Sequence, residues 1–290
     1  MTSRAASDLR ARAEALSAPF APLLAAADSL ARAVQLGEHG QRRAGQGDAF
    51  WQYRRAQPGD PAHRIDWRRS ARADRLYVQE KEWQTAKTVQ LWADGGASMG
   101  FASHPDLPRK SDRAALLITA LSVLLLRAGE RVGLSGDSQP AGQGRVVAER
   151  VAARLTAADP LPDLDAGLHK PHARHVIASD FLGPLDGVER YVTRAAAQGA
   201  RGAIVQLLDP VEERFPFQGR VVFEDMTGQV EYDTREAADL RGRYLQRLAA
   251  RKAKLQDIAR RAGWRCLTHH TDAPALPALL WLTRAVGERA

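Results

Sequence analysis

The sequence has little of what disulfides, zinc clusters and membrane spans require. Cys266 is the only cysteine among 290 residues, which excludes a disulfide within the chain and a four-cysteine zinc site. No apolar run approaches the roughly 20 residues that a helix needs to cross a bilayer, and the first residues lack the apolar core of a secretory signal. We therefore expect a cytoplasmic protein without a membrane span.

The glycine patterns that bind nucleotide phosphates are incomplete or missing. Gly95 and Gly100 have the spacing of a P-loop, but Phe101 and Ala102 stand where its lysine and its serine or threonine would be. No Gly-x-Gly-x-x-Gly follows the strand that precedes this turn. Nucleotide binding at the turn is therefore not expected.

Positive charge exceeds negative charge, with 42 Lys and Arg against 34 Asp and Glu and a formal net charge of +8. Such a balance can indicate a polyanionic partner. The cations are mostly arginines scattered among acidic residues, so we do not expect nucleic acid to be the partner. The hydrophobic fraction of 44% supports a sizeable core and predicts a globular protein.

A strand, helix, strand unit organises the chain. Residues 88–93 alternate as a short buried strand does, and a glycine-rich turn follows them. Residues 114–128 form an apolar helix, for which Ser111 or Asp112 is the expected N-cap, and residues 132–134 are the next strand. Such a unit predicts a parallel sheet with helices packed outside it.

The remaining elements continue this alternation. The patterns predict helices over residues 5–18, 22–36, 146–155, 188–198, 235–262 and 275–286, strands over 76–80, 175–180, 203–209 and 264–268, and a hairpin that turns at Gly228. We therefore predict an α/β fold over residues 87–290, with a mostly parallel sheet flanked by helices. An N-terminal helical segment, residues 1–36, and a segment of irregular and β structure, residues 37–86, come before it.

The segment from residue 48 to residue 75 has the most unusual composition. It contains seven Arg, four Asp, one His and four large aromatic residues. Guanidinium groups stack on aromatic rings and pair with carboxylates, so this inventory supports either an internal lattice or a phosphate-binding surface. Because Asp60, Asp66 and Asp74 alternate with the arginines, the lattice is the favoured interpretation.

Oxygen ligands for a divalent cation follow two of the predicted strands. Asp94 and Ser98 come after the first strand, and Asp180 ends the strand over residues 175–180. Ligands bind at the carboxyl ends of parallel strands, and Mg²⁺ or Mn²⁺ needs only one or two carboxylates. These residues therefore predict a candidate metal site whose open position could take a carboxylate of a partner.

Two other groups of residues suggest chemistry less strongly. His269 and His270 follow the last predicted strand, but consecutive residues of extended chain point to opposite faces and rarely chelate together. Gly96, Ser98 and Gly100 have the spacing of a hydrolase nucleophile elbow, and Ser98, Asp180 and His270 occur in the chain order of a hydrolase triad. Both remain alternatives to the metal site.

Several motifs resemble those of a known family. They are Gly45-x-Gly47-Asp48-x-Phe50, Pro58-Gly59-Asp60, Arg64-Ile65-Asp66-Trp67, Ser70-Ala71-Arg72, Trp92-x-Asp94-x-x-x-Ser98-Met99 and Ser179-Asp180-Phe181-Leu182. From residue 37 onward the chain is similar to the bacterial DUF58 family. The resemblance implies a von Willebrand factor A-like domain, a doubly wound, mostly parallel sheet with a metal-ion-dependent adhesion site at the ends of its strands. No enzymatic reaction is established for the family. The resemblance also implies that the protein acts together with a MoxR-type AAA+ ATPase in chaperone-like assembly or maturation of other proteins.

The adhesion site that the resemblance implies is an Asp-x-Ser-x-Ser motif with a Thr and an Asp from later loops. Asp94 and Ser98 match its first and last positions, and Asp180 matches its later Asp. Gly96 replaces the middle serine, and no matching threonine precedes Asp180. The resemblance therefore implies a degenerate site, for which Mg²⁺ or Mn²⁺ is the candidate ion.

These arguments predict a non-enzymatic protein-binding adaptor that binds a MoxR-type AAA+ ATPase through the face around Asp94, Ser98 and Asp180. We expect residues 37–86 to pack on the main domain and to brace this face. Partner-binding or structural roles are predicted for the signature residues Arg54, Asp60, Arg64, Asp66, Trp67 and Arg72. The alternatives are a hydrolase with Ser98 as nucleophile and a polyanion binder that uses residues 54–75.

Overall fold

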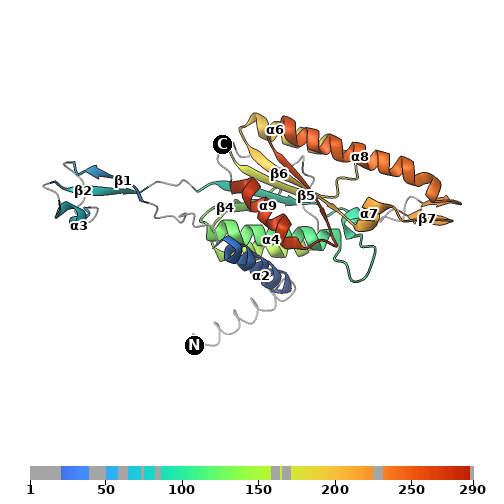
Figure 1. The fold of residues 1–290 in the computed structure, drawn as a ribbon, viewed down its shortest axis with the longest axis horizontal. Helices are drawn as coiled ribbons and strands as arrows, with labels where there is room; N and C mark the ends of the chain where they lie inside the picture. The colour runs from blue at the N-terminus through green and yellow to red at the C-terminus, as the bar shows by residue number, and fades with distance from the viewer. Residues whose placement is uncertain are drawn as a thin grey trace. The chain divides into compact units, whose positions relative to one another are not determined.

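The structure of the protein is a computed structural model (Figure 1). It describes residues 21–38, 50–57, 65–72, 75–81, 86–157, 164, 171–224 and 231–287. Contacts divide the chain into two compact units, a larger one of Met1–Gly37 with Lys87–Ala290 and a smaller one of Glu38–Ala86.

The larger unit contains a parallel sheet. Its strands are β3 (Thr88–Ala93), β4 (Arg131–Leu134), β5 (Arg174–Ser179), β6 (Arg201–Leu208) and β9 (Arg265–His270), in the order β4-β3-β5-β6-β9. β3 and β5 pair in parallel, with Leu91 opposite Val176. Most residues of the three central strands are buried, as expected for strands covered on both faces. The predicted α/β fold with a parallel sheet is confirmed.

Helices cover both faces of this sheet. They are α2 (Ala21–Glu38), α4 (Lys110–Arg127), α5 (Arg145–Thr156), α6 (Asp186–Ala197), α7 (Pro210–Arg214), α8 (Ala238–Arg261) and α9 (Ala275–Gly287). Figure 1 shows α4 and α2 below the sheet and α6 and α8 above it. α5 and α9 both pack against α4. The outermost helix on this side, α2, buries Ala27, Ala31 and Val34 in the core and pairs Asp28 with Arg127 of α4.

α4 is the central helix of the core, because it is apolar on nearly every side. Leu117, Ile118 and Leu121 are at most 1% exposed. The helix begins at Lys110 with Arg109 as its N-cap residue, so the prediction of a Ser111 or Asp112 cap was wrong. It begins earlier because the Lys110 side chain contacts carboxylates of the sheet's carboxyl end, as described below, and these tertiary contacts are invisible to a capping pattern.

Two further predictions require correction after β6. The last strand, β9, does not end at residue 268 but continues through His269 and His270, because these residues pair with Leu207 and Leu208 at the end of β6. A short helix, α7, follows β6 where the sequence analysis predicted no helix. The predicted hairpin is present as β7 (Val221–Glu224) and β8 (Glu231–Thr234), but its turn at Gly228 lies outside the described residues.

The smaller unit contains an antiparallel pair, β1 (Phe50–Arg55) and β2 (Tyr77–Lys81), and a short helix, α3 (Trp67–Ser70). The Asp66 side chain accepts a hydrogen bond from the Arg69 amide at 3.0 Å and caps α3. The Arg69 guanidinium lies 5.4 Å from the centre of the Tyr77 ring. This contact is of the kind that arginines and aromatic residues were predicted to make in this segment.

Candidate functional site

Asp94 and Asp180 lie at the carboxyl ends of neighbouring strands. The Asp94 amide donates to the Ala178 carbonyl at 2.9 Å, so the chain after β3 stays beside β5. The Asp94 carboxylate accepts hydrogen bonds from Ser179 Oγ at 2.6 Å and from the Gly96 amide at 2.7 Å. The structure therefore brings the ends of β3 and β5 together, and each oxygen of the Asp94 carboxylate accepts a hydrogen bond from the protein.

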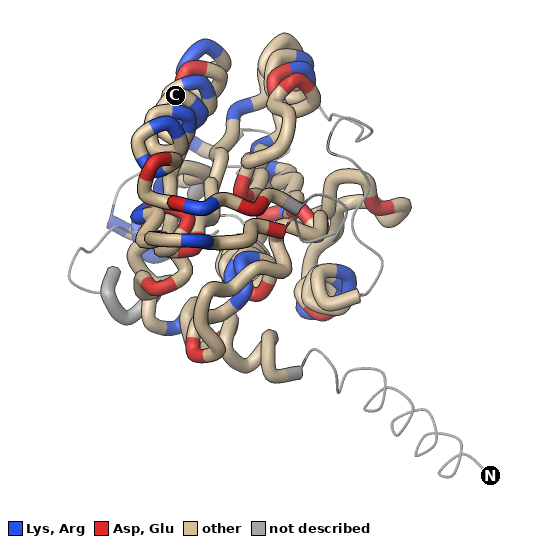
Figure 2. Tube along the Cα trace, turned by 90° about the vertical axis from the view of Figure 1, so that its right-hand side faces the viewer, with Lys and Arg blue, Asp and Glu red and all other residues tan. Residues whose placement is uncertain are grey.

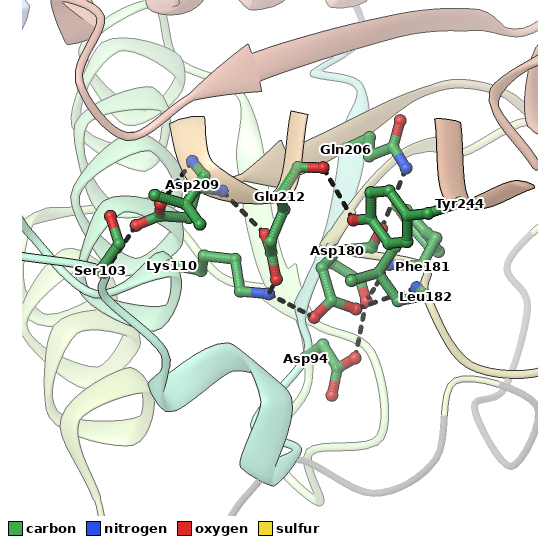
Figure 3. A network of polar contacts seen from close by, with 12 residues as sticks. Asp94, Ser103, Lys110, Asp180, Phe181, Leu182, Gln206, Asp209, Glu212 and Tyr244 are labelled. Atoms are coloured by element: carbon green, nitrogen blue, oxygen red, sulfur yellow. Dashed lines mark hydrogen bonds and ion pairs between the residues drawn. The ribbon is translucent and has the colours of Figure 1, made fainter. Parts of the chain in front are cut away.

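Asp180 is buried beside a lysine. Its Oδ1 accepts a hydrogen bond from the Leu182 amide at 3.0 Å, and its Oδ2 lies 2.8 Å from Lys110 Nζ. The same Nζ lies 2.6 Å from Glu212 Oε1. The Lys110 side chain is 0% exposed, against 3% for Asp180 and 15% for Glu212. Figure 3 shows the ammonium between the two carboxylates, one of which follows the end of β5 while the other lies within α7 (Pro210–Arg214).

A capping box positions Glu212 in α7. Asp209 Oδ1 accepts from the Val211 amide, and Glu212 Oε2 accepts from the Asp209 amide, while Pro210 starts the helix. Asp209 Oδ2 also accepts from the Ser103 amide at 2.9 Å, which links α7 to the loop before α4. The capping box and this loop therefore hold Glu212 where it meets Lys110.

Burial and charge act in opposite directions on Glu212. Burial raises the pKa of its carboxyl group above the ordinary value, and the neighbouring Lys110 charge opposes that rise. The backbone carbonyl of Glu212 accepts a hydrogen bond from Tyr244 Oη of α8 at 2.7 Å. Burial raises the pKa of the Tyr244 phenol to about 12. Tyr244 is therefore a stable hydrogen-bond donor over the physiological pH range.

Ser98 lies apart from this buried group. It belongs to η2 (Ala97–Gly100), a short 3-10 helix whose Met99 is 0% exposed and anchors the turn in the core. The Ser98 side chain is exposed. A Cβ atom at Gly96 would lie 3.0 Å from Asp94 Oδ1, so a serine at this position would crowd the turn that Asp94 closes. This contact gives a physical reason for glycine at the middle motif position.

The two histidines face different partners. His269 Nε2 lies 3.4 Å from Arg113 Nη1, and burial, followed by the Arg113 charge, lowers the pKa of His269 to about 4. His270 Nε2 lies 3.2 Å from Glu213 Oε2. Because Asp180 pairs with Lys110, the structure does not join His270 to Asp180 as a hydrolase triad would require.

A divalent ion does not fit these carboxylates as they stand. Each oxygen of Asp94 and Asp180 already accepts a hydrogen bond from the protein, and Lys110 supplies a positive charge between Asp180 and Glu212. Within the part of the chain that the structure describes, no three His, Cys, Asp or Glu residues are placed to hold a metal ion. The predicted Mg²⁺ or Mn²⁺ site stays a prediction, and the charge of Lys110 opposes an ion on Asp180.

The signature residues of the smaller unit are described in part. Asp66 caps α3, whereas Trp67 is 59% exposed and Arg72 is exposed. Arg54 lies in β1 with its backbone opposite Val78. Asp60 and Arg64 lie outside the residues that the structure describes. Figure 2 shows basic and acidic positions interspersed on helices of the chain, as expected from a sequence in which arginines are scattered among acidic residues.

Sequence reasoning missed Lys110 and Glu212 as members of the site. The sequence Asp209-Pro210-x-Glu212 has the spacing of a helix start, so it could have predicted α7 and its capping box. No local pattern distinguishes Lys110 from the many surface cations of the chain. Only the fold shows that this lysine is buried.

Comparisons with known proteins find relatives whose function is not described. Uncharacterised proteins of Mycobacterium tuberculosis strain H37Rv and of Mycobacterium bovis are each 26% identical over 253 residues, which cover 81% of this chain and 78% of those proteins. No described helix of the chain is long and apolar enough to cross a membrane.

Two solved structures are similar over 70% of this chain and 99% of their own length, both at 15% identity. They are the conserved hypothetical protein BatB from Bacteroides thetaiotaomicron, with a TM-score of 0.44, and an aerotolerance-related membrane protein from Bacteroides fragilis, with a TM-score of 0.43. The family model described as protein of unknown function DUF58 matches residues 52–254. This match covers more than half of the sequence, and the chain therefore belongs to the DUF58 family.

Proposed function

We propose that this protein is a non-enzymatic adaptor that binds a partner protein on the face formed by the carboxyl ends of its strands. The observation that carries the proposal is that donor groups of the protein itself bind the carboxylates on this face. Asp94 and Asp180 accept hydrogen bonds from Ser179, Gly96, Leu182 and Lys110. Carboxylates held in this way maintain a rigid surface, whereas general acid–base catalysis needs a group that can reach a substrate proton.

The exposed part of this face is the turn from Gly95 to Ser98, which we call the β3 turn. All four of its residues are exposed, and Met99 anchors it from below. Small side chains let a partner approach the backbone closely, and a turn held from below loses little entropy when it binds. The β3 turn is therefore suited to docking against another protein.

The partner that we propose is a MoxR-type AAA+ ATPase. This choice rests on the family resemblance of the motifs around Asp94 and Asp180. Assembly or maturation of other proteins would then be the process in which the pair acts. The small unit, with its exposed Trp67, would supply a second contact of the adaptor.

Binding of the purified MoxR-type ATPase to immobilised protein tests the proposal. We expect Ala97→Arg to weaken binding about tenfold or more, because a long charged side chain would stand in the centre of the β3 turn. The matched control is Val146→Arg, since Val146 is 75% exposed at the start of α5. Gln143, three residues before Val146, donates a hydrogen bond from its side chain to the carbonyl of Gly129 in the turn before β4. Val146 therefore lies near the amino ends of the strands, opposite the β3 turn.

Equal binding by Ala97→Arg and Val146→Arg would rule out the β3 turn as the docking surface. No binding by the wild-type protein would rule out the ATPase as the partner. Ser98→Ala addresses the hydrolase alternative, for which we expect no loss of activity on ester or phosphate substrates. Activity that disappears in Ser98→Ala would contradict the non-enzymatic role.

A further inference from the structure

Lys110 has surroundings that distinguish it from the other cations described. Its Nζ lies 2.8 Å from Asp180 Oδ2 and 2.6 Å from Glu212 Oε1, and its side chain is 0% exposed. Nζ also lies over the Phe101 ring, 5.8 Å from the ring centre. An ammonium group has three donors, so two are used by carboxylates and the aromatic face covers the charge.

We infer that the Lys110 ammonium is the resident cation of this site and replaces a divalent ion there. The inference departs from the metal-ion-dependent adhesion site that the motif resemblance implied. It concerns the chain by itself and does not depend on the identity of any partner.

Geometry and charge both support the replacement. A Mg²⁺ ion binds oxygen at about 2.1 Å, so an ion on Asp180 Oδ2 would stand within about 5 Å of the ammonium. Two positive charges at that separation repel strongly in a buried site. The other Asp180 oxygen and both Asp94 oxygens are occupied by protein donors. Each of these oxygens keeps a further lone pair, so the charge of Lys110, more than these hydrogen bonds, opposes the ion.

Removal of Lys110 should instead favour binding of a divalent ion, because it leaves Asp180 and Glu212 close together without a counterion. The carboxylate oxygens of these two residues are hard ligands of the kind that Mg²⁺ and Mn²⁺ prefer. Asp94, bound to Ser179 beside them, provides a further carboxylate at the same edge of the sheet. Loss of the ammonium should thus turn a site that excludes divalent ions into one that binds them.

The experiment compares the full chain with Lys110→Ala and Lys110→Met by calorimetric and electron paramagnetic resonance titration with Mn²⁺. We expect no saturable binding by the wild-type protein. Lys110→Ala should bind about one Mn²⁺ ion per chain, and Mn²⁺ should raise its melting temperature. The double variant Lys110→Ala with Asp180→Asn should lose this binding. Lys252→Ala is the matched control, because Lys252 pairs with Glu213, the neighbour of Glu212, and should gain no metal binding.

Saturable Mn²⁺ binding by the wild-type protein that disappears in Asp94→Ala or Asp180→Asn would overturn the inference. A folded Lys110→Ala or Lys110→Met protein that binds no Mn²⁺ would also overturn it. If neither variant folds in the absence of metal, refolding with and without Mn²⁺ decides the question. Recovery of the folded state only with Mn²⁺ supports the inference, and failure in both conditions contradicts it.

Discussion

Glu212 and Glu213 are consecutive residues of one short helix, yet they form two very different ion pairs. Glu212 points inward to Lys110, and the two side chains are 15% and 0% exposed. Glu213 points outward to Lys252 and His270, which are 20% and 32% exposed, and is itself 37% exposed. Residue type and sequence position are almost the same, so the difference arises from the surroundings.

The surroundings also reverse the direction of the pKa shift. Burial is the largest influence on both carboxyl groups and favours the neutral form. It prevails at Glu212, whose pKa is raised, despite the opposing charge of Lys110. At Glu213 the hydrogen bonds and charges of Lys252 and His270 together outweigh burial, and the pKa is lowered. The comparison shows that the balance between burial and the charged partners sets the direction of each pKa shift.

The largest effect that we expect comes from the inward pair, Lys110 and Glu212. Lys110→Met should reduce the free energy of unfolding by about 3–5 kcal/mol, because it leaves Asp180 and Glu212 as buried carboxylates without a counterion. Urea unfolding followed by circular dichroism at neutral pH measures this loss. Lys252→Met is the control on the outward pair. Similar losses in both variants would contradict the distinction between the two pairs.

His269 extends the comparison to a second pair of neighbours, since His269 is buried and His270 is not. Burial and Arg113 lower the pKa of His269 from 6.5 to about 4. Between pH 6.5 and about pH 4 the folded state thus binds fewer protons than the unfolded state, so the free energy of unfolding decreases as the pH falls through this window. The loss should reach up to about 3 kcal/mol. Urea unfolding across the window, with His269→Gln as the reference, should show a shallower pH dependence in the variant.

Glu212→Gln should produce an intermediate effect, a loss of about 1 kcal/mol, because the weaker hydrogen bond to Lys110 is partly offset by relief of the buried carboxylate charge. The raised pKa of Glu212 gives a stabilising contribution that is present at low pH and is lost as pH rises above 4.5. The lowered pKa of Glu213 gives the reverse, a contribution present above 4.5 and lost as pH falls. Unfolding of Glu212→Gln and Glu213→Gln against pH should therefore change the slope in opposite directions. Slopes that change in the same direction would show that the two glutamates do not differ as described.

The smallest effect belongs to the outward pair. Lys252→Ala should cost about 0.2–1 kcal/mol, because a partly exposed ion pair gains little beyond what water provides. The effect should shrink further at high salt, which screens exposed charges. Urea unfolding at low and high salt measures both. A salt-independent loss of several kcal/mol would instead place Lys252 in the same class as Lys110.

The fold was largely predictable because its signals are local. The alternation of residues 88–93, the apolar helix after them and the strand that follows predicted a parallel unit, and β3, α4 and β4 form it. Hydrophobic periodicity reports which side of an element is buried, and elements of a parallel sheet are buried on both faces. Boundaries were less predictable. α4 begins before its expected cap, and β9 continues through His270, because contacts with distant residues extend them.

The candidate site was predictable only at its strand ends. Asp94 and Asp180 could be placed together because neighbouring parallel strands end at one edge of the sheet. Lys110 lies 70 residues from Asp180 and 102 residues from Glu212 in the sequence. No periodic pattern spans such separations, and a lysine is ordinarily a solvated surface residue.

The sequence by itself therefore determined the order and type of the strands of the parallel sheet and of most helices around it, and the acidic residues at two strand ends. Only the tertiary structure decided that Lys110 is buried between Asp180 and Glu212 of α7, and that Glu212 and Glu213 have opposite environments. The physical reason is that secondary structure follows from the period of nearby side chains, whereas burial of a charge depends on which distant groups the topology brings against it.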